Sequence, residues 1–123
     1  EKAKEMKDDA KEVFFEASLF DLIAAFTKAL RKVSEQTFHQ ITKEEFTVEQ
    51  KIHDILHLLL EAPTISLTEL FGRARSKLEI IVTFMAILEL IRLKEIIVAH
   101  KRVFGDIEIL RNRDNVAPVD NNT

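Results

Sequence analysis

Apolar side chains recur every three or four residues along much of the chain, the spacing of amphipathic helices. The first such segment carries apolar residues at Val13, Phe14, Ala17, Phe20, Ile23, Phe26, Ala29, Leu30 and Val33. Ser18 and Asp21 have capping-box spacing, so a helix can start inside this segment. The pattern therefore predicts an amphipathic helix over 13–33 that either is continuous or breaks between Ala17 and Leu19.

Three further capping boxes mark helix starts, at Thr47, Ser66 and Ser76, each followed by Gln or Glu three residues later. The helix after Thr47 ends before Pro63, because proline cannot continue it. Its predicted buried face consists of Val48, Ile52, Ile55, Leu56 and Leu59. The helix after Ser66 is short, with apolar positions at Leu67, Leu70, Phe71 and Ala74, and Gly72 weakens its end.

The third box opens the longest clear helix, roughly residues 77–93. One side of it carries Leu78, Ile81, Val82, Met85, Leu88 and Ile91. A second set widens the apolar surface beyond one stripe: Ile80, Phe84 and Ile87. An apolar surface this broad is typical of a middle helix buried on two sides, so this set can be core, partner contact or both.

The hydrophobic period then changes to two. Residues 96–100 and 107–109 have strand patterns, and the stretch between them contains Gly105 and can turn. The segment 64–66 is short and consists of residues that favour an extended strand. The resulting order of helix, short strand, two helices and a strand hairpin is that of a winged helix. We therefore predict a mainly α fold with a small β-hairpin, in which a winged-helix domain is preceded by an amphipathic helix.

The same pattern suggests how the chain is divided. Residues 1–36 hold a charged N-terminal segment and the amphipathic helix, and 37–46 form a linker that has room for a short strand near 39–42. The winged-helix domain covers 47–110. Residues 111–123 are polar and are expected to form a flexible tail.

Composition narrows the class of protein. The 123 residues are 46% hydrophobic and 32% charged, with two glycines, two prolines and a net charge of −3. There is no cysteine, which excludes disulfides and thiolate metal sites. No apolar run reaches about 18 residues, so no membrane span is expected. The chain begins at Glu1, and we expect it to be part of a longer protein.

Candidate catalytic chemistry is sparse. His53 and His57 have the i, i+4 spacing of a zinc-binding helix, but Asp54 replaces the glutamate that serves as base in metalloproteases, and no third ligand is evident. Two surface histidines are the simpler interpretation. No nucleophile–base set or glycine-rich phosphate loop stands out. We predict no catalytic residue, no metal, no cofactor and no enzymatic activity.

A winged helix can also be a DNA-binding regulator that places its third helix in the major groove. Here the polar positions of that helix carry charges that cancel: Lys77, Glu79, Thr83, Glu89 and Arg92. DNA binding needs a basic surface, because phosphate contacts supply most non-specific affinity. DNA binding therefore remains the alternative function, and we expect any DNA contact to be weak or indirect.

Four motifs, in order along the chain, resemble the segregation and condensation protein A family of bacterial kleisins. They are Leu19 to Phe26 (LFDLIAAF), Thr47 to Ile52 (TVEQKI), Ile81 to Ile91 (IVTFMAILELI) and Phe104 to Ile109 (FGDIEI). The resemblance implies a non-enzymatic subunit of the SMC complex, cytoplasmic and nucleoid-associated, that acts in chromosome condensation and segregation. It implies that the C-terminal winged helix binds the head of one SMC ATPase, while an N-terminal domain binds the coiled-coil neck of the other. The middle region would bind a dimeric accessory subunit, ScpB.

The resemblance also suggests which residues meet those partners. Candidates for the SMC-head interface are Phe84, Leu88, Ile97, Phe104, Ile107 and Ile109. Candidates for contact with the ScpB-like dimer are Phe20, Ile23 and Phe26. For this second group, packing on the winged helix or self-association is the alternative, and it is favoured because an apolar stripe without its partner finds other cover. No membrane partner is expected.

Overall fold

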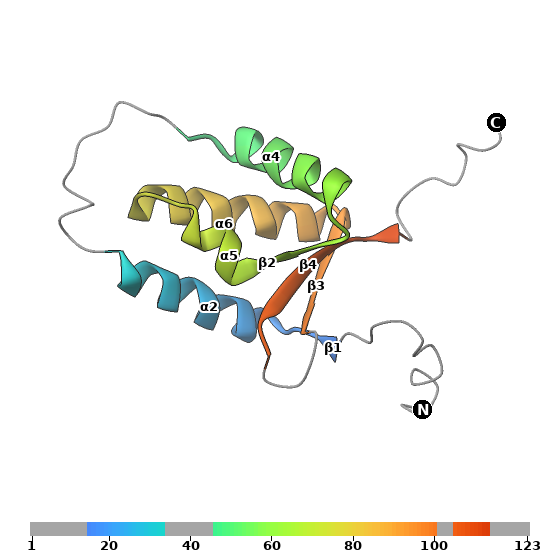
Figure 1. Ribbon diagram of the computed structural model, residues 1–123, viewed down its shortest axis with the longest axis horizontal. Helices are drawn as coiled ribbons and strands as arrows, with labels where there is room; N and C mark the ends of the chain where they lie inside the picture. Colours follow the sequence, from blue (N-terminus) through green and yellow to red (C-terminus); the bar gives the residue numbers. More distant parts are fainter. Residues whose placement is uncertain (1–14, 34–45, 101–104, 114–123) are drawn as a thin grey trace.

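The computed structural model describes residues 15–33, 46–100 and 105–113, with only the backbone of residues 15 and 16 (Figure 1). Its elements, in chain order, are β1 (Phe15–Glu16), α2 (Leu19–Lys32), α4 (Val48–Glu61), β2 (Thr64–Ser66), α5 (Leu67–Gly72), α6 (Lys77–Arg92), β3 (Ile96–His100) and β4 (Ile107–Arg111). The predicted class, mainly α with a small β-hairpin in a winged-helix-like arrangement, is confirmed.

All four described helices start at the predicted caps. Thr47, Ser66 and Ser76 each accept a hydrogen bond from the backbone N–H three residues later. At α2 the box is reciprocal. The Ser18 hydroxyl accepts from the Asp21 N–H at 3.2 Å, and the Asp21 carboxylate accepts from the Ser18 N–H at 3.0 Å. These bonds satisfy N–H groups that the first helical turn leaves without partners.

The start of the first helix differs from the continuous form of the prediction. Residues 15–16 form strand β1, and the helix begins only at Leu19, which confirms the break near Ala17 to Leu19. Ser18 has an extended backbone and ends the helical path toward the N-terminus. The preceding residues can then pair with the open edge of β3, where Phe15 lies opposite His100.

The four strands form one antiparallel sheet in the order β1-β3-β4-β2. The β3–β4 hairpin is its centre, with Val98 opposite Ile109. The short strand β2 pairs with β4 on the other side, where Ile65 lies opposite Ile109. Strand β4 continues to Arg111, one residue beyond the predicted domain end, and Arg111 forms an ion pair with Glu95 at 3.4 Å.

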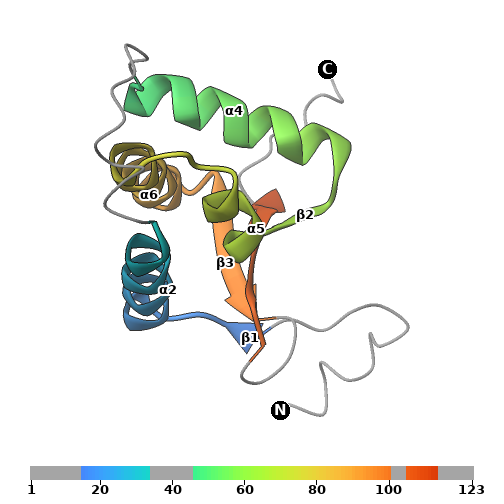
Figure 2. The ribbon, with the colours of Figure 1, turned by 60° about the vertical axis from the view of Figure 1, so that its left-hand side comes forward.

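Helix α6 lies between α4 and α2, and all three stand on one side of the hairpin (Figure 2). The largest fully buried side chains come from α4, α5, α6 and the hairpin: Ile55, Leu67, Ile80, Ile87, Leu90, Ile96 and Ile109. Leu22 of α2 is also buried in this core. The amphipathic helix therefore packs on the winged helix and shares its core, so 19–32 is not structurally separate from 47–110.

Several predictions fall on residues outside the described ranges: the charged N-terminal segment, the short strand near 39–42, the turn at 101–104 and most of the C-terminal tail. Phe104 is among these residues. None of the helices in the described part of the chain combines the length and the apolar character needed to cross a membrane.

Candidate functional site

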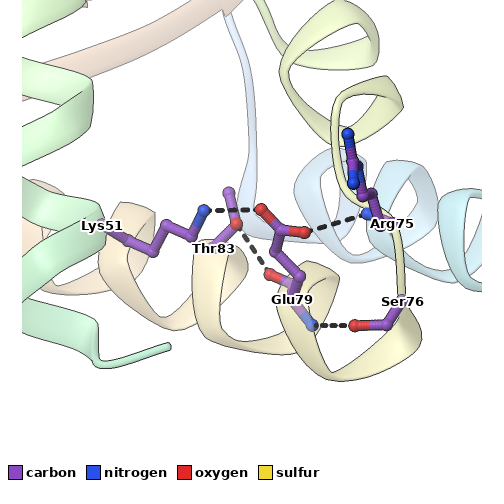
Figure 3. Close-up of polar contacts among 5 residues, drawn as sticks. All are labelled: Lys51, Arg75, Ser76, Glu79 and Thr83. Carbon is purple, nitrogen blue, oxygen red and sulfur yellow. Dashed lines mark hydrogen bonds and ion pairs between the residues drawn. The ribbon is translucent and has the colours of Figure 1, made fainter. Parts of the chain in front are cut away.

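Glu79 anchors the N-terminal end of α6 (Figure 3). Its carboxylate accepts a hydrogen bond from the Lys51 ammonium of α4 at 2.7 Å and another from the Arg75 backbone N–H at 2.9 Å. The Lys51 and Glu79 side chains are only 16% and 14% exposed, so the ion pair is largely shielded from water. One turn later, the Thr83 hydroxyl donates to the Glu79 carbonyl at 2.7 Å. These contacts fix α6 against α4 and the preceding loop.

Aromatic side chains hold the α2 side of α6. The ring of Phe26 is stacked on that of Phe84, and a second ring, Phe71 of α5, lies 6.3 Å from Phe26 in a tilted arrangement. Both rings of the stacked pair are half-buried and pack on the core. Phe84 therefore points toward α2 and contributes to packing within the chain.

The outward face of α6, between α2 and α4, is apolar. Leu78, Ile81 and Met85 are 50%, 38% and 48% exposed, and their spacing of three and four places them on one side. We call these three residues the outward face. Leu88 borders it and is half-buried against the core. An exposed apolar strip on a well-fixed helix is a surface suited to a protein partner.

The polar residues of α6 do not provide a base-reading surface. Glu79 and Thr83 are turned into the domain, as described above. Glu89 and Arg92 are paired at 2.6 Å, which lowers the pKa of Glu89 and raises that of Arg92 through their mutual hydrogen bond. Base recognition in the major groove needs polar side chains that are directed outward. The exposed side of α6 thus argues against a DNA-reading role.

The hairpin divides the remaining SMC-head candidates by face. Ile97 of β3 is 45% exposed on the outer face of the sheet, opposite the half-buried Leu110. Ile107 and Ile109 point the other way and are buried in the core. Among the hairpin candidates that the structure describes, Ile97 is therefore the one that a partner can reach without repacking the domain.

The three ScpB-contact candidates on α2 also differ in exposure. Phe20 is 80% exposed and Ile23 is 42% exposed, whereas Phe26 is packed against the two rings described above. Phe20 and Ile23 are therefore accessible to a partner, and Phe26 acts in the packing of α2 on α5 and α6.

The start of α2 is tied to the hairpin by Asp21 and His100. Asp21 Oδ2 lies 3.3 Å from His100 Nε2, and His100 Nδ1 lies 2.8 Å from the Gly105 carbonyl oxygen. Hydrogen bonds from the Ser18 backbone N–H and then from His100 hold the pKa of Asp21 below its usual value. This contact positions α2 relative to the sheet.

His53 and His57 lie on the exposed side of α4, with ring centroids 6.3 Å apart and nearly parallel planes. Within the described residues, no group of three or more His, Cys, Asp and Glu side chains is placed to share a metal ion. Two neighbouring imidazoles alone do not complete the four-coordinate shell of structural zinc.

Sequence reasoning placed the outward-face residues on one side of α6 but did not name them as interface candidates. The buried side consists of Ile80, Val82, Thr83, Ala86, Ile87 and Leu90. The useful signal was that apolar residues surround the helix almost completely. A helix with two neighbours cannot bury all of them, so some had to face outward.

Comparisons with a family model and with curated proteins match this chain to the same family. The family model described as "Segregation and condensation protein ScpA" matches residues 2–111. Proteins named segregation and condensation protein A are similar to the chain: one from Thermoanaerobacter sp. (strain X514) at 38% identity over 106 residues and one from Bacillus velezensis at 35% over 112 residues. The alignments cover 85% and 89% of this chain, and 44% and 43% of those relatives. The chain thus spans about two fifths of the length of the curated relatives it matches. No solved structure matches.

Proposed function

The chain belongs to the segregation and condensation protein ScpA family, and from that premise we propose that it is the SMC-binding part of a non-enzymatic kleisin subunit. In this proposal the winged helix docks on the head of an SMC ATPase, in the cytoplasm at the nucleoid. The complex acts in chromosome condensation and segregation, and any ATP is bound by the SMC partner.

The observation that carries the proposal is the outward face of α6. In a winged helix that reads DNA, the third helix presents polar and basic side chains to the major groove. Here the same helix presents Leu78, Ile81 and Met85. Buried apolar anchors at the centre of an interface supply most of the binding energy between proteins. Ile81 and Met85 are thus the proposed centre, with Leu88 beside them.

The hairpin extends this proposed contact. Ile97 is exposed on the outer face of the sheet and serves as a second apolar anchor. Phe84 supports the contact indirectly, because it holds α6 against α2 through Phe26. Ile107 and Ile109 support it as core residues beneath the hairpin.

A second contact, to a ScpB-like accessory dimer, is proposed for α2. Phe20 and Ile23 are exposed on that helix and can insert into an apolar groove of a partner, a common mode for amphipathic helices. Phe26 is left out of this contact because it is packed within the chain.

The decisive experiment is a pull-down of the full 123-residue chain with the isolated head of the SMC protein from the same organism. We expect a stoichiometric complex that survives high salt, because an apolar contact is little screened by ions. Absence of binding by a folded chain would contradict the proposal. A tight, sequence-selective complex with duplex DNA would favour the alternative regulator.

A further inference from the structure

We propose that a groove between α2 and α5 binds an acidic, amphipathic peptide segment of a protein partner. The groove is a cavity of about 950 Å³, at the upper end of the roughly 300–1,000 Å³ typical of ligand pockets. None of its lining residues belongs to α6. The groove is therefore distinct from the outward face, and the inference stands apart from the proposed SMC-head contact.

The floor and one wall of the groove are apolar. Leu67 and Phe71 of α5 and Ile107 of β4 form the floor, and all three are buried in the core. On the α2 side the wall carries Ala25 and Ala29, whose short side chains leave space above that floor. A ligand that fills this space gains by burying apolar groups, as the anchor residues of a peptide would.

The rim at one end of the groove is basic. Lys28 and Lys32 of α2 line it together with Arg75 from the loop before α6. Among the described residues, none of these three side chains takes part in an ion pair. The chain as a whole carries a net charge of −3, so these three cations, which have no ion-pair partner within the described part of the chain, stand out against its background.

The acidic residues at the other end do not neutralise that cluster. Asp21 is held by Ser18 and His100, and Asp106 accepts a hydrogen bond from the Thr68 hydroxyl at 3.3 Å. Asp21 precedes Lys28 by about two helical turns, roughly 10 Å along α2, and Asp106 is bonded at the first turn of α5, so both charges lie apart from the basic rim. A complementary occupant therefore combines apolar anchors for the floor with Asp or Glu side chains at the Lys28 and Lys32 end.

The apolar floor favours a peptide over nucleic acid. A phosphate backbone gains affinity from each cation it meets but has nothing to place against Leu67 and Phe71. A peptide with apolar residues at helical spacing and a cluster of glutamates satisfies both parts of the groove. The groove-docked amphipathic helix is a common form of such recognition.

The test uses the full chain and two fluorescent peptides of about 14 residues, both with Leu and Phe at helical spacing. One carries four glutamates at one end, and in the other each glutamate is replaced by glutamine. Fluorescence anisotropy measures binding at about 50 and 200 mM salt. We expect the acidic peptide to bind about tenfold more tightly at low salt, with a smaller advantage at high salt.

The chain offers a matched pair of variants. Lys28→Glu reverses a charge on the rim and should weaken the acidic peptide at least about fivefold. Arg31→Glu makes the same change on the same helix, at an exposed position that does not line the groove, and should change binding less than about twofold. Lys32→Glu should weaken the acidic peptide like Lys28→Glu. This second rim variant keeps the test valid if one of the two substitutions disturbs folding. Thermal melts confirm that each variant is folded.

Three outcomes would overturn the inference. Equal binding of the two peptides, or none, removes the charge complementarity. Equal losses for Lys28→Glu and Arg31→Glu show a general electrostatic effect. Tighter binding of a labelled DNA duplex, with the same dependence on Lys28, assigns the basic rim to nucleic acid.

Discussion

The ring of Phe26 on α2 is stacked on the ring of Phe84 on α6, with centroids 4.2 Å apart and planes inclined by 11°. The contact therefore joins α2 to α6, the helix of the winged-helix domain that lies between α2 and α4. Because Phe26 also touches Phe71, removing α2 would expose apolar surface on both α5 and α6. The amphipathic helix and the winged helix are therefore expected to unfold as one unit.

The first prediction concerns this aromatic contact. Phe26→Ala should lower the free energy of unfolding by about 2–3 kcal/mol, less than a fully buried phenylalanine, because the side chain is half-buried. Denaturant unfolding measures the change. Phe20→Ala is the matched control and should stay within about 0.5 kcal/mol of wild type, because Phe20 is 80% exposed.

A double-mutant cycle isolates the stacking itself. Phe26→Ala and Phe84→Ala should show a coupling energy of about 0.5–1.5 kcal/mol in the same unfolding measurement. Strict additivity would mean that the two rings contribute independently and that their stacking adds nothing.

The second prediction concerns the shielded ion pair. Glu79→Gln leaves the Lys51 ammonium without a counter-charge and should destabilise the chain by about 2–3 kcal/mol. Lys51→Met should cost about 1 kcal/mol or less, because Glu79 keeps the Arg75 N–H and its place in the first turn of α6. Denaturant unfolding measures both changes in the free energy of unfolding. Equal losses in the two variants would contradict the asymmetry.

The third prediction tests the outward face. Ile81→Ser and Met85→Ser should each weaken binding to the SMC head about tenfold or more, while the melting temperature stays within about 2 °C of wild type. Calorimetric titration and thermal melting supply the two readouts. Leu60→Ser, an exposed apolar position on α4, is the control and should bind normally. Normal binding by both α6 variants would place the interface elsewhere.

The fourth prediction concerns pH. The pKa of Asp21 is lowered from 3.8 in the folded chain, so its carboxylate favours folding at pH values above 3.8. That contribution is lost as pH falls below 3.8 through the lowered folded value. Asp21→Asn keeps the hydrogen-bond acceptor but not the charge. Thermal melts should therefore show a wild-type advantage at neutral pH that disappears in strong acid. If the wild-type advantage in melting temperature instead grows as the pH falls, this prediction is wrong.

The fifth prediction concerns metal. Zinc should not stabilise the chain through His53 and His57, because two imidazoles leave a structural zinc site incomplete. Melts of untagged protein with and without chelator should agree within about 1 °C. Stoichiometric zinc in the purified protein, with a clear loss of melting temperature on chelation, would overturn this expectation.

Local signals in the sequence determined where the described helices begin. Ser18, Thr47, Ser66 and Ser76 cap them at the predicted residues, because a cap needs only a side-chain oxygen and the N–H groups of the next turn. Pro63 and the change of period after α6 likewise depend on neighbours in the chain. The winged-helix order and the family resemblance rest on these local features.

Only the tertiary structure decided which side of α6 is buried and what covers α2. Leu78, Ile81 and Met85 are as apolar as Ile80 and Ile87, so the pattern alone could not separate exposed from buried positions. Strand β1 depended on the free edge of β3, which is about 80 residues away in the chain. The groove between α2 and α5 and the Phe26–Phe84 contact arise in the same way, from packing between segments that are distant in sequence.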